Sequence, residues 1–455
     1  MKIHFIAIGG SAMHNLAIAL HKKGYQITGS DDEIFEPSRT RLLKYNLLPE
    51  NCDWHPEKIH DQLDAVIVGM HARADNPELI KAQELGLKIF SYPDYLYQQS
   101  KDKKRIVIGG SHGKTTITAM VIHAFQYAAI DCDYMVGAKL EGFEVMVKLT
   151  DDAEYIVMEG DEYLTSPIDR TPKFHHYFPH IALISGIAWD HINVFPSFEN
   201  YIEQFDKYID TIQSGGSLIY CDQDAEVKDL CERKNGEYAK WPYLIPQHNI
   251  VEGKSIILHS GTEYVLNIFG DHNLLNLSGA WQVCKQVGIS DEVFLESMQT
   301  FSGASNRLEL VVENAKTSVY KDFAHAPSKL EATIKAVKKQ FPERLLIACM
   351  ELHTFSSLNS EFLKQYKGTM KRADEAYVYF NPQALKHKKL PEISVDQVLQ
   401  AFDSDNLKVF NDSELLLSEL KSQIWKDKNL LIMSSGNFDG INIVKLAEDI
   451  TINSK

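Results

Sequence analysis

The fold of this chain is decided by the stretch from Lys104 to Thr116, which reads KRIVIGGSHGKTT. Its apolar first half predicts a buried strand, its glycines predict a tight turn, and the amphipathic segment 117–128 predicts a helix. Glycines let backbone N–H groups close around phosphate oxygens, and the start of a helix adds partial positive charge. A lysine here reaches the β- and γ-phosphates, and a threonine hydroxyl can bind Mg²⁺. The stretch therefore predicts a nucleoside triphosphate site made by Gly110, Ser111, His112, Gly113, Lys114, Thr115 and Thr116.

One position departs from the general phosphate-binding pattern. That pattern has a glycine five residues before the Gly113-Lys114 pair, where this chain has Ile108, so the loop is one residue tighter. The alternative is a glycine turn that only joins a strand to a helix. The lysine and the two threonines that follow it favour the phosphate site.

Length and composition bound the class of protein. A chain of 455 residues is too long for one core and predicts about three domains. A formal net charge of −15 argues against a nucleic-acid partner, and any anionic substrate must meet local positive charge. The N-terminal apolar run stops at Gly9-Gly10 and no segment reaches transmembrane length, so we expect neither a signal peptide nor membrane insertion. We expect a cytoplasmic protein, and the sequence leaves monomer and homodimer open.

The six cysteines lie far apart, without a Cys-x-x-Cys pair. This spacing fits a reducing compartment and predicts free, mostly buried thiols rather than a disulfide or zinc framework. The thiols in question belong to Cys52, Cys132, Cys221, Cys231, Cys284 and Cys349.

Strand, turn and helix patterns recur along the chain and predict three α/β domains in series. We expect a Rossmann-like domain over 1–103, a central P-loop domain over 104–302 and a third, Rossmann-like domain over 303–455. A charged linker ends the first domain at 100–105, and the polar stretch 217–266 is expected to hold strands and turns. Strands are predicted at 3–8, 25–31, 64–69, 155–158, 181–187, 318–320, 345–350, 375–380 and 429–434, and helices at 13–20, 117–128, 329–340 and 441–450.

The N-terminal domain carries a weaker ligand signal. Its glycine turn has Ala7 where a dinucleotide fingerprint has its first glycine, so a plain tight turn and a phosphate site both remain open. A later segment from His71 to Asn76 follows directly on a strand, where parallel sheets bind their ligands. Arg73 is a candidate diphosphate partner, with a solvated surface arginine as the alternative. The candidates in this domain are Gly9, Gly10, Ser11, Asp31, His71, Arg73 and Asn76.

Acidic and imidazole side chains follow two buried strands of the central domain. Glu159-Gly-Asp-Glu162 comes directly after the first strand, and Asp190-His191 comes shortly after the second. Carboxylate oxygens and an imidazole nitrogen beside a P-loop are suitable ligands for a Mg²⁺–triphosphate. A solvated acidic surface is the alternative, and the position at the strand ends favours the metal site.

Three further segments carry candidate nucleotide contacts. Asn273 and Asn276 offer the donors and acceptors that an adenine edge requires, although asparagine is also an ordinary helix cap. Arg307 lies at the expected hinge into the third domain, where an arginine could close onto the γ-phosphate. Asp322 and His325 follow a predicted strand, again at an end that faces ligands.

Taken together, six segments resemble the Mur ligase family of ATP-dependent amide ligases of peptidoglycan metabolism. They read GSHGKTT, EGDE, WDH, GDHNLLN, SNRLE and DFAHAP, in the family's order and spacing along the whole chain. The resemblance implies a UDP-binding N-terminal domain, a central ATP-binding domain and a C-terminal amino-acid domain. It implies Lys114 on the phosphates, with Thr115, Glu159 and His191 around magnesium. It also implies Asn273 near adenine, with Arg307 and Asp322 of the C-terminal domain contacting phosphate and ribose. Asn276 and His325 are further expected ATP contacts.

The family contains several ligases that carry a modified lysine shortly after the Asp-His pair, where this chain has Gln204-Phe-Asp206 and only Lys207 beside it. This resembles the members that act directly on UDP-N-acetylmuramate, of which one adds L-alanine and another adds the tripeptide L-alanyl-γ-D-glutamyl-meso-diaminopimelate. The segment 162–180 and the turn 433–440 resemble the tripeptide enzyme. The implied peptide-binding residues are Arg170, Lys173, His353, Ser435 and Asn437.

His353 stands where the tripeptide enzyme has an arginine, and it lacks that residue's bidentate grip on a carboxylate. We therefore predict tripeptide ligation, with L-alanine ligation as the alternative amine. A P-loop NTPase switch is the alternative from a different class, although such a switch needs no second and third α/β domain.

Overall fold

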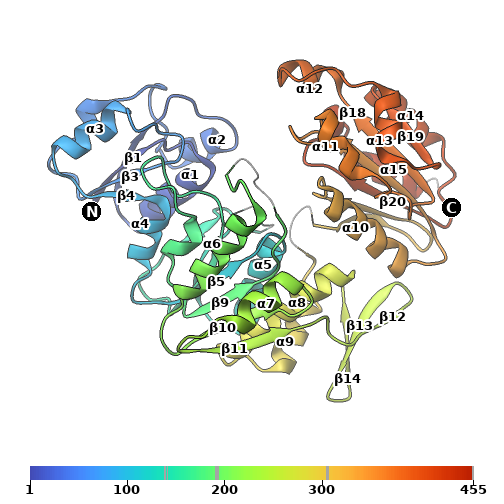
Figure 1. Ribbon diagram of the computed structural model, residues 1–455, viewed down its shortest axis with the longest axis horizontal. Coiled ribbons are helices and arrows are strands. Elements are labelled where there is room, and N and C mark those ends of the chain that lie inside the picture. Colours follow the sequence, from blue (N-terminus) through green and yellow to red (C-terminus); the bar gives the residue numbers. More distant parts are fainter. Residues whose placement is uncertain (138–139, 141, 190–193, 304–306, 453–455) are drawn as a thin grey trace. The chain divides into compact units, whose positions relative to one another are not determined.

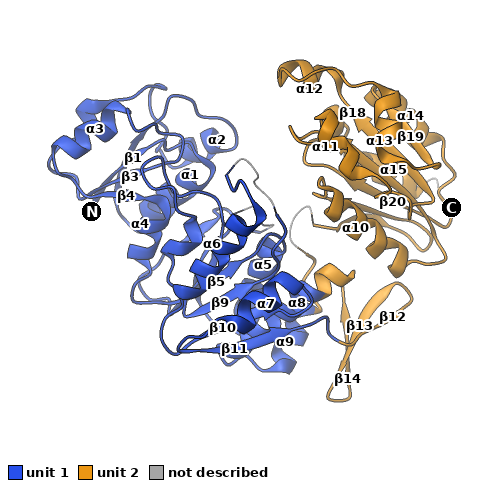
Figure 2. Ribbon diagram, viewed as in Figure 1, with its two compact units in different colours: residues 1–246, 275–298 blue, residues 247–274, 299–455 orange. Residues whose placement is uncertain are grey.

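The computed structural model describes residues 1–137, 140, 142–189, 194–303 and 307–452 (Figure 1). The chain forms two compact units (Figure 2). Unit 1 contains residues 1–246 and 275–298, and unit 2 contains residues 247–274 and 299–455. Each unit has its own sheets.

The N-terminal part of unit 1 is a four-stranded parallel sheet in the order β2-β1-β3-β4. The central strands β1 and β3 are almost continuously buried, as expected for parallel strands covered on both faces. The strands are β1 (Lys2–Ile6), β2 (Gln26–Ser30), β3 (Ala65–Val68) and β4 (Ile89–Ser91), and the helices are α1 (Ser11–Lys22), α2 (Ser38–Lys44), η1 (Pro56–Lys58), α3 (Pro77–Glu84) and α4 (Tyr92–Gln99).

The central part of unit 1 is a seven-stranded sheet in the order β11-β10-β9-β5-β8-β6-β7. All pairs are parallel except β6 with β7, and β5 lies in the middle with β9 and β8 as its neighbours. The strands are β5 (Lys104–Gly109), β6 (Cys132–Met135), β7 (Val147–Lys148), β8 (Tyr155–Glu159), β9 (Ile181–Ile184), β10 (Gly216–Cys221) and β11 (Tyr238–Tyr243). The helices are α5 (Lys114–Tyr127), η2 (Lys173–His176), α6 (Phe198–Asp210), α7 (Ala225–Arg233) and α9 (Asp291–Met298), and α8 (Asp271–Gln286) begins in unit 2 and ends in unit 1.

The charged linker between these two parts is more ordered than the sequence indicates. Lys103 is buried and pairs with Asp133 at 3.0 Å, and the buried Arg105 donates to backbone carbonyls that include those of Ser100 and Tyr177. Buried charges need such partners. One apolar core also includes residues from both parts of the unit. The linker is therefore a packed junction rather than a solvated tether.

Unit 2 contains a small antiparallel sheet and a larger, mostly parallel one. The small sheet has the order β12-β13-β14, and the larger has the order β15-β16-β20-β17-β18-β19, in which only β15 pairs antiparallel. The strands are β12 (Asn249–Val251), β13 (Lys254–His259), β14 (Thr262–Leu266), β15 (Glu309–Glu313), β16 (Ser318–Asp322), β17 (Leu345–Leu352), β18 (Glu375–Phe380), β19 (Leu407–Phe410) and β20 (Lys428–Met433). The helices are α10 (Pro327–Gln340), α11 (Ser360–Leu363), η3 (Lys364–Tyr366), α12 (Pro382–His387), α13 (Val395–Phe402), α14 (Ser413–Ser422), η4 (Phe438–Gly440) and α15 (Ile443–Ile452).

The predicted α/β class is confirmed, with parallel sheets in both units. The polar stretch 217–266 contains a helix, α7, that the expectation of strands and turns missed. Residues 247–274 belong to the same compact unit as the C-terminal sheet. All six cysteines are free and five are buried, as predicted. Among the helices of the described residues, none has both the length and the apolar content to cross a bilayer.

Candidate active site

The glycine loop after β5 adopts the predicted strand–turn–helix geometry. Gly110 and Gly113 have φ angles of 124° and 80°, in the region that favours glycine. A Cβ at Gly110 would collide with Ser185 Oγ, and one at Gly113 would collide with Asn276 Oδ1. The two glycines are therefore required both by backbone conformation and by close neighbours. The second collision also places Asn276 of α8 directly against the loop.

The end of β9 fixes the loop from one side. Ser185 donates its backbone N–H to Gly109 O at 3.0 Å, and Ser111 donates its N–H to Gly186 O at 2.9 Å. The Ser185 hydroxyl donates to the carbonyl of His112. These bonds satisfy polar groups of the loop and hold it at the start of α5.

Lys114, the first residue of α5, is held by a carbonyl and a carboxylate. Its Nζ donates to Gly110 O at 2.6 Å and pairs with Glu162 Oε2 at 2.7 Å. Burial opposes the charge, but the carboxylates of Glu162 and Asp161 outweigh that effect and raise the pKa of Lys114 above its ordinary value. The ammonium therefore remains positively charged at neutral pH, as a phosphate ligand must.

Glu159 and Thr115 lie together beside the loop. Thr115 Oγ1 donates to Glu159 Oε1 at 2.9 Å, and Gly137 N–H donates to Glu159 Oε2 at 2.8 Å. Burial raises the pKa of Glu159, against the opposing charge of Lys114. A hydroxyl and a buried carboxylate are the oxygen donors that Mg²⁺ prefers, so this pair fits a magnesium site. The third predicted ligand, His191, lies outside the described residues.

A second lysine pairs with the same acidic segment. Lys173, the first residue of η2, contacts Asp161 at 2.6 Å and lies over the ring of Tyr163. Burial would raise the pKa of Asp161, but the charges of Lys173 and Lys114 lower it below its ordinary value. Lys173 thus lies next to the acidic segment that contacts the P-loop lysine.

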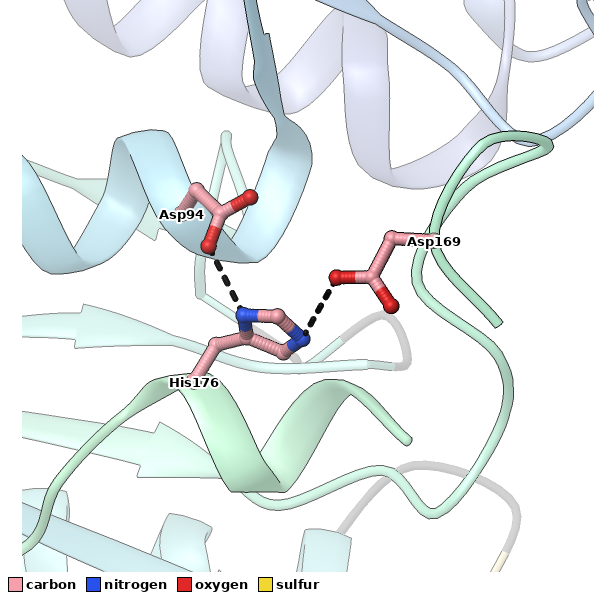
Figure 3. Close-up of side chains that lie close together, drawn as sticks. All are labelled: Asp94, Asp169 and His176. Atoms are coloured by element: carbon pink, nitrogen blue, oxygen red, sulfur yellow. Dashed lines mark hydrogen bonds and ion pairs between the residues drawn. The ribbon is translucent and has the colours of Figure 1, made fainter. Parts of the chain in front are cut away.

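The other members of η2 are also anchored. Phe174 is fully buried and stacks on Tyr208, and the His175 ring contacts Gln204 O at 2.8 Å. His176 lies between two carboxylates: its Nδ1 is 2.7 Å from Asp94 and its Nε2 is 3.4 Å from Asp169 (Figure 3).

The His176 cluster links two parts of unit 1 and does not have the geometry of a metal site. Asp94 belongs to α4, whereas Asp169 belongs to the segment before η2. The carboxylates contact opposite nitrogens of one ring (Figure 3). Thr171 Oγ1 also lies 2.7 Å from Nε2. An ion bound to one ring nitrogen would need both carboxylates on that same side of the ring. The cluster instead holds the segment 161–180 against α4.

This arrangement changes the interpretation of the basic segment 162–180. Lys173, His175 and His176 each contact a group of the protein itself, whereas Arg170 is exposed. The resemblance implied that Arg170 and Lys173 of this segment bind the peptide. In the structure the segment is an ordered lobe whose charges are mainly compensated internally.

The N-terminal glycine turn meets a carboxylate. Gly9 N–H donates to Asp31 Oδ2 at 2.7 Å, and Gly10 caps α1 without a side-chain hydrogen bond. Burial raises the pKa of Asp31 to about 6, although the bond from Gly9 lowers it. Ser11, the first residue of α1, is exposed at this turn.

A cavity of about 390 Å³ is lined by residues that follow β2 and β3, and it is formed partly by the predicted residues. Asn76 caps α3 through its carbonyl oxygen, while its amide nitrogen has no partner among the described residues. The lining includes Asp32 rather than its neighbour Asp31, and Trp54, which carried no sequence signal. The lining residues are Asp32, Trp54, His71, Arg73, Asp75, Asn76 and Pro77.

In unit 2, the predicted nucleotide contacts cluster around Phe323. The Arg307 guanidinium carbon lies 5.0 Å from the centre of the Phe323 ring, and His325 Nδ1 is 3.0 Å from Phe323 O. Asp322 accepts from Thr333 Oγ1 at 2.6 Å. Asn273 donates to Phe269 O at 3.1 Å, which uses its amide within the chain.

The ends of β17 and β20 form a separate polar cluster in unit 2. The buried Glu351 accepts from the Ser434 hydroxyl and from Phe438 N–H, and its other oxygen lies 3.6 Å from His353 Nδ1. A Cβ at Gly436 would collide with the His353 ring. The predicted residues Ser435 and Asn437 lie on the same turn. Glu351, which the sequence did not single out, anchors this turn.

Tyr201 is the main site residue that sequence reasoning missed. Its hydroxyl donates to Glu162 Oε1 at 3.1 Å and lies 2.9 Å from Ser111 Oγ, which accepts from Ala188 N–H at 2.8 Å. The acidic run that contains Glu162 was a visible signal. Tyr201 belongs to the amphipathic helix α6, and there it is indistinguishable in sequence from a core residue.

Three family models match successive parts of the chain. They are the Mur ligase family catalytic domain over residues 2–104, the Mur ligase middle domain over 108–284, and the Mur ligase glutamate ligase domain over 306–436.

Similar curated proteins are UDP-N-acetylmuramate–L-alanine ligases. The one from Carboxydothermus hydrogenoformans is 26% identical over 97% of this chain and 95% of its own length. The one from Caldicellulosiruptor bescii is 30% identical over 83% of each chain.

Solved structures with the same fold include a murein peptide ligase from Psychrobacter arcticus, with a TM-score of 0.63 and 22% identity over 99% of both chains. A UDP-N-acetylmuramate–alanine ligase from Thermotoga maritima has a TM-score of 0.69 and 19% identity, covering 99% of this chain and 98% of that one.

Proposed function

This chain belongs to the Mur ligase family of ATP-dependent amide ligases, and we propose that it joins UDP-N-acetylmuramate to L-alanyl-γ-D-glutamyl-meso-diaminopimelate. UDP-N-acetylmuramate as the carboxylate substrate is supported by the names of the curated relatives, which contain that nucleotide sugar. The cavity lined by Arg73 and Asn76 is the proposed nucleotide-sugar site. Its cation suits a diphosphate. We expect the reaction to take place in the cytoplasm, where ATP is available.

The proposed ATP site is the glycine loop with Lys114 and Asn276. Lys114 would contact the β- and γ-phosphates, while Thr115, Glu159 and His191 would hold Mg²⁺. When bound there, the ion would neutralise charge on the transferring phosphoryl group. Arg307, Asp322 and His325 are the proposed contacts from unit 2. The contacts of Arg307 and His325 with Phe323 support a common role for these two side chains.

The proposed chemistry has two steps. The lactyl carboxylate of UDP-N-acetylmuramate attacks the γ-phosphorus of ATP, so that an acyl phosphate forms and ADP leaves. The amine nitrogen of the second substrate then attacks the acyl carbon, phosphate leaves, and the nitrogen loses a proton to give the amide. Lys114 stabilises the transferring phosphoryl, and holding the substrates together removes much of the entropic barrier.

The tripeptide assignment rests on one observation, the ordered lobe 161–180 beside the P-loop. Its turn η2 is anchored at every residue, and it brings Lys173 to within 2.6 Å of Asp161. A free alanine needs little beyond a contact for one carboxylate and a space for a methyl group. A lobe held in place beside the P-loop is better suited to a longer amine with several carboxylates, and exposed Arg170 is a cation that could meet one of them.

L-Alanine is the second candidate amine, because the similar curated proteins carry that activity in their names. The test compares kcat/KM for the tripeptide and for L-alanine at saturating ATP and UDP-N-acetylmuramate. We expect the tripeptide to be preferred by about tenfold or more, which corresponds to about 1.4 kcal/mol. Preference for L-alanine would reject the tripeptide assignment. ATP turnover without UDP-N-acetylmuramate would instead favour a nucleotide switch.

A further inference from the structure

Lys114 and Glu162 form a largely buried pair. The side chains are 14% and 1% exposed, and their charged atoms are 2.7 Å apart. A phosphate ligand of Lys114 would approach the same ammonium, whose other contact is the fixed carbonyl of Gly110. Glu162 and a phosphate oxygen are both anions, so they compete for one cation in a site of low dielectric.

Glu162 also has a donor that does not belong to Lys114. Tyr201 is fully buried on α6, and its hydroxyl donates to the second carboxylate oxygen at 3.1 Å. Because its single proton is used there, the Ser111 hydroxyl donates to the Tyr201 oxygen and accepts from Ala188 N–H. A chain of hydrogen bonds therefore runs from the carboxylate to the P-loop backbone.

We propose that Glu162 is a positioning residue that competes with phosphate for Lys114, so that nucleotide binding moves the lysine from Glu162 to the phosphate while Tyr201 keeps the carboxylate in place. The inference rests on the proposed role of Lys114 in binding ATP. Only the molecules in which Lys114 has left Glu162 can bind phosphate through the lysine. The apparent dissociation constant is therefore the intrinsic one divided by the fraction of such molecules. The same competition helps the site to release ADP, because the departing phosphate is replaced by a carboxylate already at hand.

The neighbouring pair Lys173–Asp161 provides the matched control. It is similar in length, at 2.6 Å, and its acid lies in the same short segment. Its lysine lies on η2 rather than on the P-loop. Removing the charge of Asp161 therefore removes the same formal charge from this segment without breaking the direct ion pair of the phosphate-binding lysine.

The test measures the dissociation constant of MgADP by calorimetry on the full chain. Glu162→Gln is expected to bind MgADP about tenfold more tightly, because the amide keeps the bond from Tyr201 and loses the charge that holds Lys114. Asp161→Asn should change affinity by less than about threefold. Glu162→Asp retains the charge and should restore affinity to within about twofold of the unmodified chain. Unchanged or weaker binding in Glu162→Gln would overturn the proposal.

Tyr201→Phe tests the proposed role of Tyr201 in holding the carboxylate, and it should change MgADP affinity in the opposite direction. It should weaken MgADP binding about threefold or more, because the carboxylate left by Lys114 loses a donor. In the Glu162→Gln background the same substitution should have little effect, since no carboxylate remains to be held. An equal loss in both backgrounds would mean that Tyr201 acts only through Ser111, and would overturn its role in the exchange.

Lys114→Ala separates this inference from the proposed function. Weaker MgADP binding in that variant, together with unchanged binding in Glu162→Gln, rejects the exchange and leaves the P-loop assignment intact. Unchanged binding in Lys114→Ala rejects the P-loop assignment itself. Thermal melting of each variant verifies that the chain is folded, and Tyr201→Phe keeps the proposal testable if Glu162→Gln is not.

Discussion

Two glycine turns in unit 1 join a buried parallel strand to a helix, yet they meet opposite charges. At the first, between β1 and α1, Gly9 N–H is bound by the carboxylate of Asp31. At the second, between β5 and α5, Lys114 begins the helix and its ammonium lies against Gly110 O. Both helices offer the same partial positive charge at their N-termini. The side chains around the turn therefore decide how each can receive an anion.

The comparison separates positioning from chemistry. At the first turn a carboxylate already occupies a backbone donor, so under the proposed function a diphosphate would be held mainly in the cavity lined by Arg73. At the second turn a lysine, a threonine hydroxyl and Glu159 lie within one group of contacts. Charge that develops on a transferring phosphoryl group is best stabilised at the second turn.

The largest expected effect follows from removing the charge at the second turn. Lys114→Ala should lower kcat for ATP-dependent ligation about a hundredfold or more, because in the proposed mechanism the ammonium stabilises the transferring phosphoryl group. The loop should keep its shape, since its conformation depends on Gly110 and Gly113. Steady-state kinetics and thermal melting measure the two effects. Near-normal turnover would remove the distinction between the turns.

The second turn could be predicted from sequence because its information is local. Its strand, glycines, lysine and threonines are contiguous in the sequence. Local patterns also located strands elsewhere, and β18 has the predicted bounds, Glu375–Phe380. The contacts of η2 could not be predicted, because partners such as Asp94 are 82 residues away from His176. Tyr201 was hidden in the same way, 39 residues from Glu162. Periodicity predicts which face of a helix is buried, but it does not identify the polar group that a buried hydroxyl meets.

The next prediction compares a glycine-to-alanine substitution at each of the two turns. Gly113→Ala adds a Cβ at a φ of 80° and against Asn276, so we expect a loss of about 2 kcal/mol in stability and roughly tenfold in the KM for ATP. Gly10 has a φ of −55°, and the nearest atom to an added Cβ is 3.4 Å away. Gly10→Ala should therefore change stability by less than about 0.5 kcal/mol. Chemical denaturation and ATP titrations distinguish the variants, and equal effects would contradict the contrast.

The metal prediction tests whether the acid at the second turn is functional. Glu159→Gln should raise the Mg²⁺ concentration needed for half-maximal activity by about tenfold, because an amide oxygen is a weaker ligand than a carboxylate. His191→Ala should act in the same direction. Activity is titrated against Mg²⁺, with melting temperature as the control. If activity fell only in parallel with the melting temperature, these side chains would be structural.

The smallest effect belongs to the first turn, where the charge of Asp31 is unfavourable. Burial raises the pKa of Asp31 to about 6, whereas an unfolded aspartate titrates near 3.9. Between about pH 4 and pH 6 the folded chain binds more protons, so this residue's contribution to stability falls as pH rises, by at most about 3 kcal/mol. Asp31→Asn retains an oxygen that can accept from Gly9 and removes the charge. The variant should match the unmodified chain near pH 4 and melt roughly 2–4 °C higher at pH 7.5. A lower melting temperature at pH 7.5 would mean that the ionised carboxylate stabilises the turn, and the two turns would then differ less in their handling of charge.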